Sequence, residues 1–361
     1  MKTRINYIDN LRTVTVSLVL VYHLAMAYNT WGEANYIFFE RVKPIASIVV
    51  FISPWFMPLM FLLAGISAAF SLKKRSSMDF IKERFKRLGL PLLFGIIIIC
   101  PILSFVADKF HNAYDGNYFE HYLIFFTKFT DFTGYDGGVT IGHFWFLAAL
   151  LVFSCAGCGV NRAIDYLTRK KEKAIFIING VLIILAIAAF DIDFWGKKIL
   201  TYFFVYLLGY YLFSKQKFVE RLMNLSCHAS REAAGIRFGW WLLMGTFVFV
   251  SIMNVILFVY LEDYKLLNNI CNYISFVTGI LALICLGKTY LDYSNKTSRC
   301  CARLSYGFYI VHFPIVVLCQ YFISLTEVGS VGNFVISFVL SAVLTCGVCF
   351  IMDKIAITFL R

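Results

Sequence analysis

Long apolar stretches alternate with short polar ones along the whole chain. A membrane-spanning helix needs about 20 mostly apolar residues, and ten stretches approach or exceed that length, the fifth being the shortest. They lie at 11–30, 44–71, 88–107, 142–160, 174–190, 198–214, 238–261, 268–287, 304–325 and 331–352. The pattern predicts an all-α integral membrane protein, a bundle of about ten transmembrane helices forming a single domain over residues 1–361.

Lys and Arg fall mostly on one side of this predicted bundle. When the ten stretches are taken as spans, 26 of the 33 Lys and Arg residues share a side with the N-terminus, and seven lie on the other side. Cytoplasmic loops carry such an excess of positive charge. We therefore expect a multi-pass protein of the cell membrane with both termini in the cytoplasm.

The first stretch has an alternative interpretation as a cleaved secretory signal. A basic start, an apolar run from Val14 and the triplet Ala25-Met26-Ala27 match such a signal and its cleavage site. Tyr22 and His23 interrupt the apolar run just before that triplet. We therefore favour a first helix that is retained.

Composition excludes a water-soluble protein. Hydrophobic residues make up 60% of the chain and charged residues 15%, against about 45–50% and 25% in soluble domains. The net charge of +12 would suit nucleic acid, but the cytoplasmic loops already account for it, so we expect membrane lipid and no nucleic acid as a partner. The sequence is compatible with a monomer and with an oligomer.

Most of the 11 cysteines lie inside the apolar stretches, where Cys packs as a small apolar residue. Cys155 with Cys158, and Cys346 with Cys349, have the spacing of zinc ligands. A four-thiolate zinc site is thus an alternative, but such sites stabilise small polar domains, and we expect no metal.

One extracytoplasmic connection, residues 108–141, is much longer than the others. Loops of this length are usually functional or carry their own structure. Its middle, from Tyr118 to Phe129, is apolar enough for a helix at the membrane interface. Such a helix could cover the bundle or act as a lid over a site.

Ionisable residues at membrane depth are functional candidates, because burying them in lipid is costly. Arg12 and His23 are eleven positions apart, which places them on one face of a helix with His23 about 16 Å deeper. Asp9 lies three residues before Arg12 and can pair with it. A guanidinium binds phosphate, and an imidazole can take a proton from a hydroxyl. Alternatively, His23 serves packing by bonding a neighbouring carbonyl.

A second basic group follows the second stretch. Arg84 and Arg87 share a helix face just before Pro91, which can open the third span. Paired guanidiniums at a helix entrance suit polyphosphate. The alternative is that they only fix topology, as we expect for the basic run 73–75.

Two further groups of polar residues precede or lie within later spans. His143 opens the fourth span at its outer rim, where it could meet an extracytoplasmic substrate, and Trp145 suits an aromatic belt. Ser305, Tyr309 and His312 form one polar face of the ninth span, with hydrogen bonding inside the bundle as the simpler role for Ser305. His312 is deep enough to approach His23.

Pro54 and Pro58 fall inside the second span. They are expected to bend or break that helix and to free backbone carbonyls that line a cavity. Interrupted helices also occur in carriers, though there they come as a pair in corresponding halves of the chain.

Together these residues resemble membrane-bound acyltransferase family 3, and within it the glucan succinyltransferase-like proteins. Four motifs carry the resemblance, in order along the chain. The matching residues are Tyr7, Asp9, Arg12 and His23; Arg84, Arg87 and Pro91; His143, Trp145, Phe146 and Leu147; and Ser305, Tyr309, His312 and Pro314. The chain departs from the family where relatives often carry Ser-Gly in the second span, because Ala64-Gly65 stands there.

The resemblance implies an O-acyltransferase. Such an enzyme takes an acetyl or succinyl group from cytoplasmic acyl-CoA, its donor substrate, and uses no bound cofactor. It delivers the acyl group to a hydroxyl of an extracytoplasmic carbohydrate, as in O-acetylation or succinylation of a cell-envelope polysaccharide. The implied roles are a general base for His23, orientation of Arg12 by Asp9, CoA phosphate binding by Arg12, Arg84 and Arg87, and acceptor binding by His143, Trp145, Ser305, Tyr309 and His312. The alternatives are a carrier or flippase for a small anionic or glycan substrate, and a structural or sensor protein.

Overall fold

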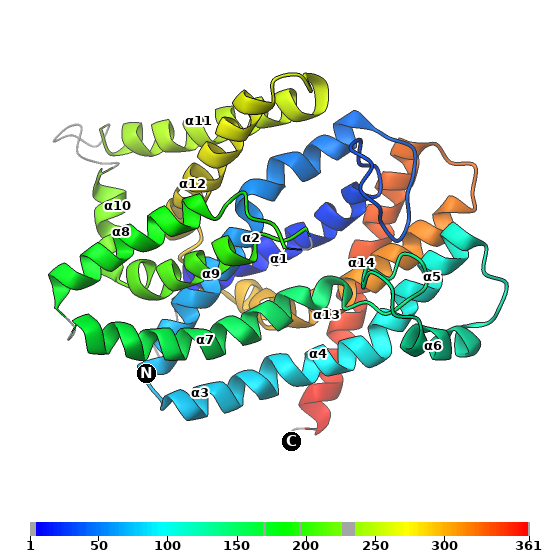
Figure 1. Cartoon of the computed structure of the whole chain (residues 1–361), viewed down its shortest axis with the longest axis horizontal. Helices are drawn as coiled ribbons and strands as arrows, with labels where there is room; N and C mark the ends of the chain where they lie inside the picture. The colour runs from blue at the N-terminus through cyan, green and yellow to red at the C-terminus, as the bar shows by residue number, and fades with distance from the viewer. Residues whose placement is uncertain (1–4, 169–170, 195, 226–234, 360–361) are drawn as a thin grey trace. The chain divides into compact units, whose positions relative to one another are not determined.

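A computed structural model describes residues 5–168, 171–194, 196–225 and 235–359 (Figure 1). The described residues form an all-α protein, in which the only β-type pairing is an isolated bridge between Phe194 and Lys197. The predicted fold class is therefore confirmed.

Each of the ten predicted stretches forms helix. Among the residues that the structure describes, seven helices are long and apolar enough to cross a membrane, and two shorter apolar helices occupy Lys173–Ala188 and Ile199–Phe213. The first predicted stretch belongs to α1 (Asn6–Met26), which begins earlier and ends earlier than expected. Residues 27–42, which follow it, have no regular helix, yet they bury Tyr28 and Tyr36.

The chain divides into two compact units. The first unit comprises Met1–Leu11, Val50–Leu88 and Ala148–Tyr293, and the second comprises Arg12–Val49, Gly89–Leu147 and Ser294–Arg361. The α-helices α1, α2 (Lys43–Leu72) and α7 (Trp145–Thr168) run from one unit into the other, and so does the helical segment Ser77–Asn112, which crosses at its π-turn η1.

Two antiparallel helix pairs dominate the first unit, as Figure 1 shows. One pair is α8 (Glu172–Ala188) with α9 (Ile199–Leu208), and the other is α11 (Gly235–Val255) with α12 (Lys265–Tyr290). The remaining elements of this unit are α3 (Ser77–Arg84), most of the π-turn η1 (Phe85–Gly89), η4 (Gly209–Phe213), α10 (Gln216–Leu225) and η5 (Ile256–Tyr260).

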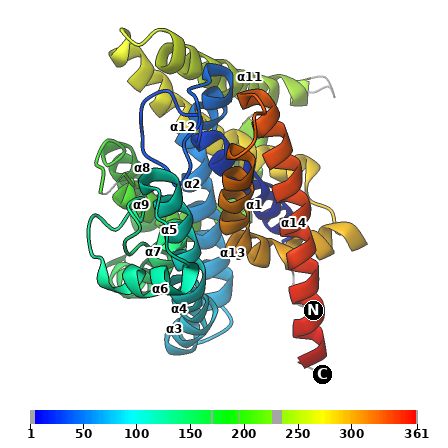
Figure 2. The same ribbon diagram turned by 90° about the vertical axis from the view of Figure 1, so that its right-hand side faces the viewer.

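The second unit is built on α13 (Lys296–Ser324) and α14 (Ser330–Phe359), which lie side by side (Figure 2). Helix α5 (Cys100–Asn112) packs against α13 and carries α6 (Tyr118–Thr127) on it. The remaining elements are α4 (Leu90–Phe94), η2 (Gly95–Ile99) and the 3-10 turn η3 (Gly142–Phe144).

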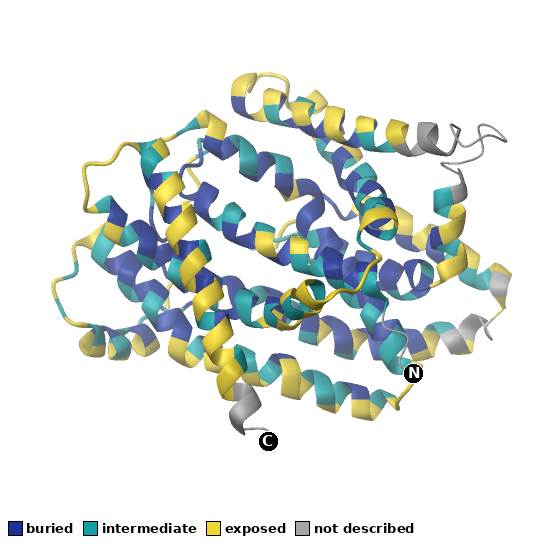
Figure 3. Cartoon of the chain, turned by 180° about the vertical axis from the view of Figure 1, so that it is seen from behind, coloured by how far each residue is buried: buried dark blue, intermediate teal, exposed yellow. Residues whose placement is uncertain are grey.

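Helix α14 is apolar on its exposed face and polar on its buried one. Val331, Val339 and Val343 are exposed, whereas Ser337 and Ser341 are completely buried. Figure 3 shows the exposed face as a yellow stripe along this helix, which leads to the C-terminus. A soluble helix has the opposite distribution. This arrangement fits a helix whose outer face meets lipid.

Helix α2 corrects the expectation from its two prolines. It is one unbroken helix that contains both Pro54 and Pro58. Pro54 lacks an N–H, so the carbonyl of Val50 loses its partner within the helix. The side chain of Asn254 on α11 donates a hydrogen bond to that carbonyl at 3.4 Å, and Asn268 on α12 donates to Asn254 at 3.0 Å. Asparagines from neighbouring helices therefore satisfy the freed carbonyl.

The third span also differs from its prediction, because Pro91 does not open it. A continuous helical segment runs from Ser77 to Asn112 through that proline. It begins at Ser76, whose hydroxyl accepts a hydrogen bond from the Asp79 N–H at 3.1 Å and so caps α3. The π-turn η1 directly precedes α4 and Pro91. Pro91 is thus accommodated inside a helix that the Ser76 cap starts much earlier.

Two glycines of the first unit bring helix backbones into contact. A Cβ atom on Gly65 of α2 would lie 2.0 Å from the carbonyl oxygen of Tyr206, and one on Gly209 would lie 2.3 Å from that of Leu62. Side chains at either position would force the backbones apart. Gly65 is therefore required here for packing, whatever residue stands at position 64.

Candidate active site

Three histidines from distant parts of the sequence gather in the second unit. The ring centroids of His23 and His312 are 5.5 Å apart, and those of His143 and His312 are 5.2 Å apart. His143 and His312 are buried, whereas His23 is half-buried. The approach of His312 to His23 agrees with the depth estimated from sequence. We call these three side chains the histidine cluster.

The hydrogen bonds of His312 define which of its two ring nitrogens carries the hydrogen when the ring is neutral. Its Nδ1 lies 2.8 Å from the carbonyl oxygen of Tyr309, one turn back on α13. A carbonyl only accepts, so Nδ1 carries the hydrogen and Nε2 presents a lone pair. That Nε2 is buried and has no hydrogen-bond partner in the described part of the chain.

His143 has the complementary arrangement. Its Nε2 lies 3.1 Å from the carbonyl oxygen of Ile310, so Nε2 carries the hydrogen and Nδ1 presents the lone pair. Among the described residues nothing hydrogen-bonds that Nδ1 either. The cluster therefore holds two buried acceptor nitrogens, each of which costs about 1–3 kcal/mol when unsatisfied. A hydroxyl donor would satisfy them.

His143 reaches α13 because of the turn that precedes α7. Gly142 adopts a left-handed φ of +48°, and a Cβ there would lie 3.0 Å from Leu103. The N–H of Gly142 donates to the Thr140 hydroxyl at 2.9 Å, which fixes this turn. His143 is consequently enclosed beside the middle of α13 rather than placed at an open rim, as the sequence had suggested.

Two aromatic residues frame the histidine cluster. Tyr309 donates its hydroxyl hydrogen bond to the carbonyl of His143, which ties α13 to η3. The ring of Phe313 lies 4.0 Å from that of His23 and 5.4 Å from that of His143. Phe313 was not predicted as a site residue, although it stands between His312 and Pro314 in one of the four motifs.

Trp145 and Ser305, the other two residues predicted to bind the acceptor, are close in sequence to His143 and Tyr309 but make different contacts. Trp145 begins α7 and is half-buried, and its neighbour Phe146 packs on Tyr309 with ring centroids 5.6 Å apart. Ser305 donates to the carbonyl of Ala302 at 3.0 Å on its own helix. This bond matches the simpler role considered for Ser305.

Asp9 and Arg12 lie one turn apart on α1, and both are half-buried. The helix continues to His23 in its last turn. The sequence prediction that these three residues share one helix thus holds.

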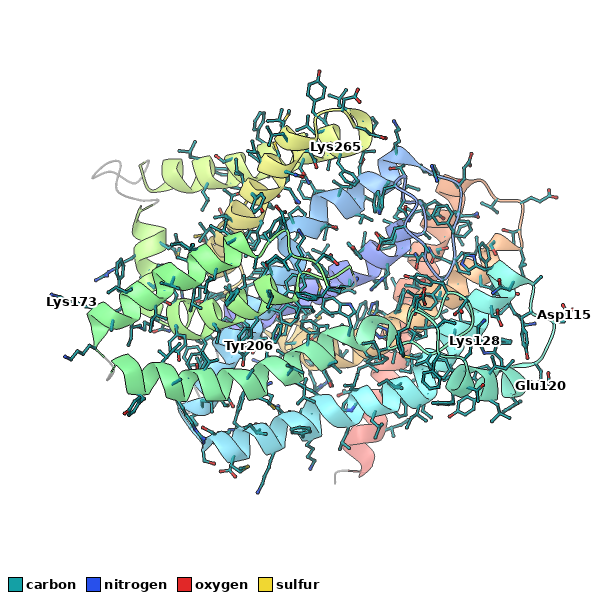
Figure 4. All side chains as sticks on the ribbon, in the orientation of Figure 1. Asp115, Glu120, Lys128, Lys173, Tyr206 and Lys265 are labelled. Carbon is teal, nitrogen blue, oxygen red and sulfur yellow. The ribbon has the colours of Figure 1, made fainter. Side chains whose placement is uncertain are left out.

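Arg84 and Arg87 have different surroundings within the first unit. The Arg84 guanidinium lies over the ring of Phe80 at 4.7 Å and interacts electrostatically with Tyr206, which Figure 4 labels. Arg87 falls in the π-turn η1 and is exposed, with a 2.9 Å ion pair to Glu83. Glu83 also pairs with Arg75.

The long connection 108–141 contains a helix that packs on α5. Asn117 and Glu120 form a capping box at the start of α6, and Phe125 is fully buried. His121 of α6 lies 3.2 Å from the Asp108 carboxylate of α5. Burial lowers the pKa of His121, and the neighbouring Asp108 carboxylate partly opposes that shift.

Next to this connection, the side chain of Tyr36 donates to the carbonyl of Thr133 at 2.8 Å. Burial raises the pKa of Tyr36 well above its ordinary value, so its hydroxyl stays protonated and remains a donor.

No group of three or more His, Cys, Asp or Glu side chains is arranged to hold a metal ion in the described ranges. In both CxxC pairs the cysteines are free thiols.

Comparison with protein families gives one match that covers nearly the whole chain. A family model described as an acyltransferase domain matches residues 5–354. Comparison with curated proteins finds no significant match, and comparison with solved structures finds none.

Proposed function

Since the chain belongs to acyltransferase family 3, we propose that this multi-pass membrane protein is an O-acyltransferase of the cell membrane. It transfers an acyl group, acetyl or succinyl, from cytoplasmic acyl-CoA to a hydroxyl of an extracytoplasmic carbohydrate. Residues 1–361 act as a single acyltransferase domain, with acyl-CoA as donor substrate and no bound cofactor.

The observation that carries this proposal is the histidine cluster with its two unsatisfied acceptor nitrogens. Two buried lone pairs favour a ligand that donates hydrogen bonds, as a sugar hydroxyl does. In this proposal His23 is the general base for that hydroxyl, and Asp9 orients Arg12. His143, Trp145, Ser305, Tyr309 and His312 contribute to binding the acceptor.

The donor requires cationic groups for the phosphates of CoA. We assign Arg84, Arg87 and Arg12 to this role, because guanidinium–phosphate hydrogen bonds are strong and directional. The ion pair of Arg87 with Glu83 must open or be shared when phosphate binds.

We expect Arg84→Ala and Arg87→Ala to weaken acyl-CoA binding more than Lys73→Ala does. A charge-assisted hydrogen bond contributes about 1.5–3 kcal/mol, whereas an exposed loop lysine is screened by water. Lys73 is a suitable control because it lies 5.1 Å over the ring of Phe70, a cation–π contact like that of Arg84. Calorimetry on the three purified variants measures the difference in affinity for acyl-CoA. Equal affinities would show that both arginines only fix the topology of the loop.

A carrier or flippase for a small anionic or glycan substrate is the alternative function. A carrier is expected to have paired interrupted helices, whereas Pro54 and Pro58 lie within one unbroken helix, α2. A carrier consumes no thioester, so the assay below separates the two functions.

The experiment that tests the proposed function is acceptor-dependent release of CoA. Purified protein is incubated with acetyl-CoA or succinyl-CoA, with and without a panel of glycans. Free CoA is then quantified by chromatography, because the 11 cysteines would react with thiol reagents. Release that depends on a glycan supports the proposal, and no release from any thioester refutes it.

The proposed direction of transfer also predicts the sidedness of two loops. A membrane-impermeant maleimide should modify Asp115→Cys from outside intact cells, and Lys74→Cys only after permeabilisation, both in a cysteine-free background. Asp115 is exposed in the α5–α6 connection (Figure 4), and Lys74 is exposed in the basic loop before α3. We choose Lys74 because a cysteine there leaves the Ser76 cap of α3 in place. External labelling at position 74 would place that loop on the wrong side for cytoplasmic acyl-CoA.

A further inference from the structure

In the proposed function, Nε2 of His312 does no more than accept a hydrogen bond from the acceptor hydroxyl. Its Nδ1 is committed to the Tyr309 carbonyl, with the Phe308 carbonyl also within 3.2 Å. Its Nε2 lone pair is buried without a partner among the described residues, although the ring is fully enclosed. A buried polar atom left unsatisfied in a native structure requires an explanation, and an absent ligand is one.

The backbone fixes which nitrogen of His312 is basic. Because both carbonyls near Nδ1 can only accept, the neutral ring must keep its hydrogen there. A ring held in this way resembles the histidine of a proton-transfer site, where a bond at one nitrogen orients the other. The acceptor nitrogen at Nε2 is therefore ready to take a proton.

His23 is the neighbour with which such a proton would be shared. The two rings are 5.5 Å apart between centroids, and the Phe313 ring packs directly on His23. His23 is half-buried, so it is the more accessible member of the pair. Two imidazolium charges this close would repel each other, so the pair holds one proton at a time.

We infer that Nε2 of His312 is a second proton-accepting atom of the catalytic site, acting with His23 as one imidazole pair. This inference rests on the proposed function. As the hydroxyl oxygen bonds to the thioester carbon, its proton passes to the pair. The carbon–sulfur bond breaks with its electrons on sulfur, and the proton finally goes to that thiolate, giving ester and free CoA.

Two substitutions separate this role from a structural one. His312→Asn retains an amide that can donate to the Tyr309 carbonyl but has no atom at the Nε2 position. His312→Gln places an amide near Nε2, but that amide is not basic. A proton-accepting Nε2 predicts that both variants lose about 10²-fold or more in kcat while acyl-CoA still binds. A structural His312 predicts that at least one of them keeps wild-type activity.

The double variant tests whether the two histidines act as a unit. Residues that act together show strongly non-additive losses, so His23→Ala combined with His312→Asn should be no slower than the worse single variant. Gln320→Met is the matched control on α13, since Gln320 is also buried and donates to a backbone carbonyl, that of Leu24, at 3.1 Å. Its activity per folded protein should remain unchanged.

Each outcome of these measurements decides the inference. Wild-type activity in either His312 variant, or losses that multiply in the double variant, would overturn the imidazole pair. A wild-type protein that releases no CoA from any thioester would instead overturn the proposed function, and the pair with it. Thermal melts of every purified variant establish the folded fraction to which rates are normalised.

Discussion

The His23→Ala variant should lose acyl transfer almost completely while it still folds and binds acyl-CoA. A positioned general base contributes about 10²–10⁴-fold to the rate, and His23 sits in the last turn of α1 beside His312 and Phe313. Since His23 is only half-buried, removing its ring leaves no large closed cavity. The measurement is the rate of CoA release at saturating donor, together with the dissociation constant of acyl-CoA.

The matched control for His23 is a second histidine of the same unit. His111 is exposed, its ring contacts the carbonyl of Asn35 at 2.8 Å, and it is not a member of the histidine cluster. His111→Ala should therefore keep the wild-type rate. If His23→Ala also turned over at the wild-type rate, His23 would be a packing residue and the mechanism would need a different base.

Gly65→Ala should destabilise the protein strongly, and Gly65→Leu should prevent its accumulation in the membrane. The added Cβ would meet the Tyr206 carbonyl oxygen at 2.0 Å and the Tyr210 nitrogen at 3.2 Å, both backbone atoms that no side-chain rotation can move. Overpacking of this kind costs about 1–3 kcal/mol for small additions. Thermal unfolding in detergent measures the loss.

Gly180→Ala is the control for this effect. Gly180 is a helical glycine of α8 with no atom within 4 Å of the added Cβ. Alanine also favours helix over glycine, so Gly180→Ala should leave stability unchanged or raise it. Equal stability of the Gly65 and Gly180 variants would show that α2 and α9 can separate without cost.

Hydropathy was sufficient to predict the helical class, since lipid-facing helices must be apolar over their whole length. The bounds of the helices depend on local signals as well. The Ser76 cap was readable in the sequence and would have placed the start of the third helical segment at Ser77. The π-turn at Phe85–Gly89 was not readable, because propensity does not distinguish it from α-helix.

The candidate site shows the same division between local and long-range information. The rise per residue of a helix was enough to predict that His23 and His312 lie at similar depths in the membrane. The enclosure of His143 depends on the left-handed backbone of Gly142 and on packing against α13. Its hydrogen-bond partner on that helix, Ile310, lies 167 residues further along the chain. Likewise, the partner of the Val50 carbonyl, Asn254, lies 204 residues along the chain. Such contacts arise from tertiary structure and leave no periodic signal in one sequence.

Sealed proteoliposomes test the central claim, acyl transfer from one side of the membrane to a hydroxyl on the other. A glycan acceptor is trapped inside the vesicles, acyl-CoA is added outside, and the acylated glycan is quantified after the vesicles are washed and opened. The account predicts acylation of the trapped glycan, appearance of free CoA outside, and loss of both with His23→Ala. Acylation only of a glycan added on the same side as acyl-CoA would contradict it.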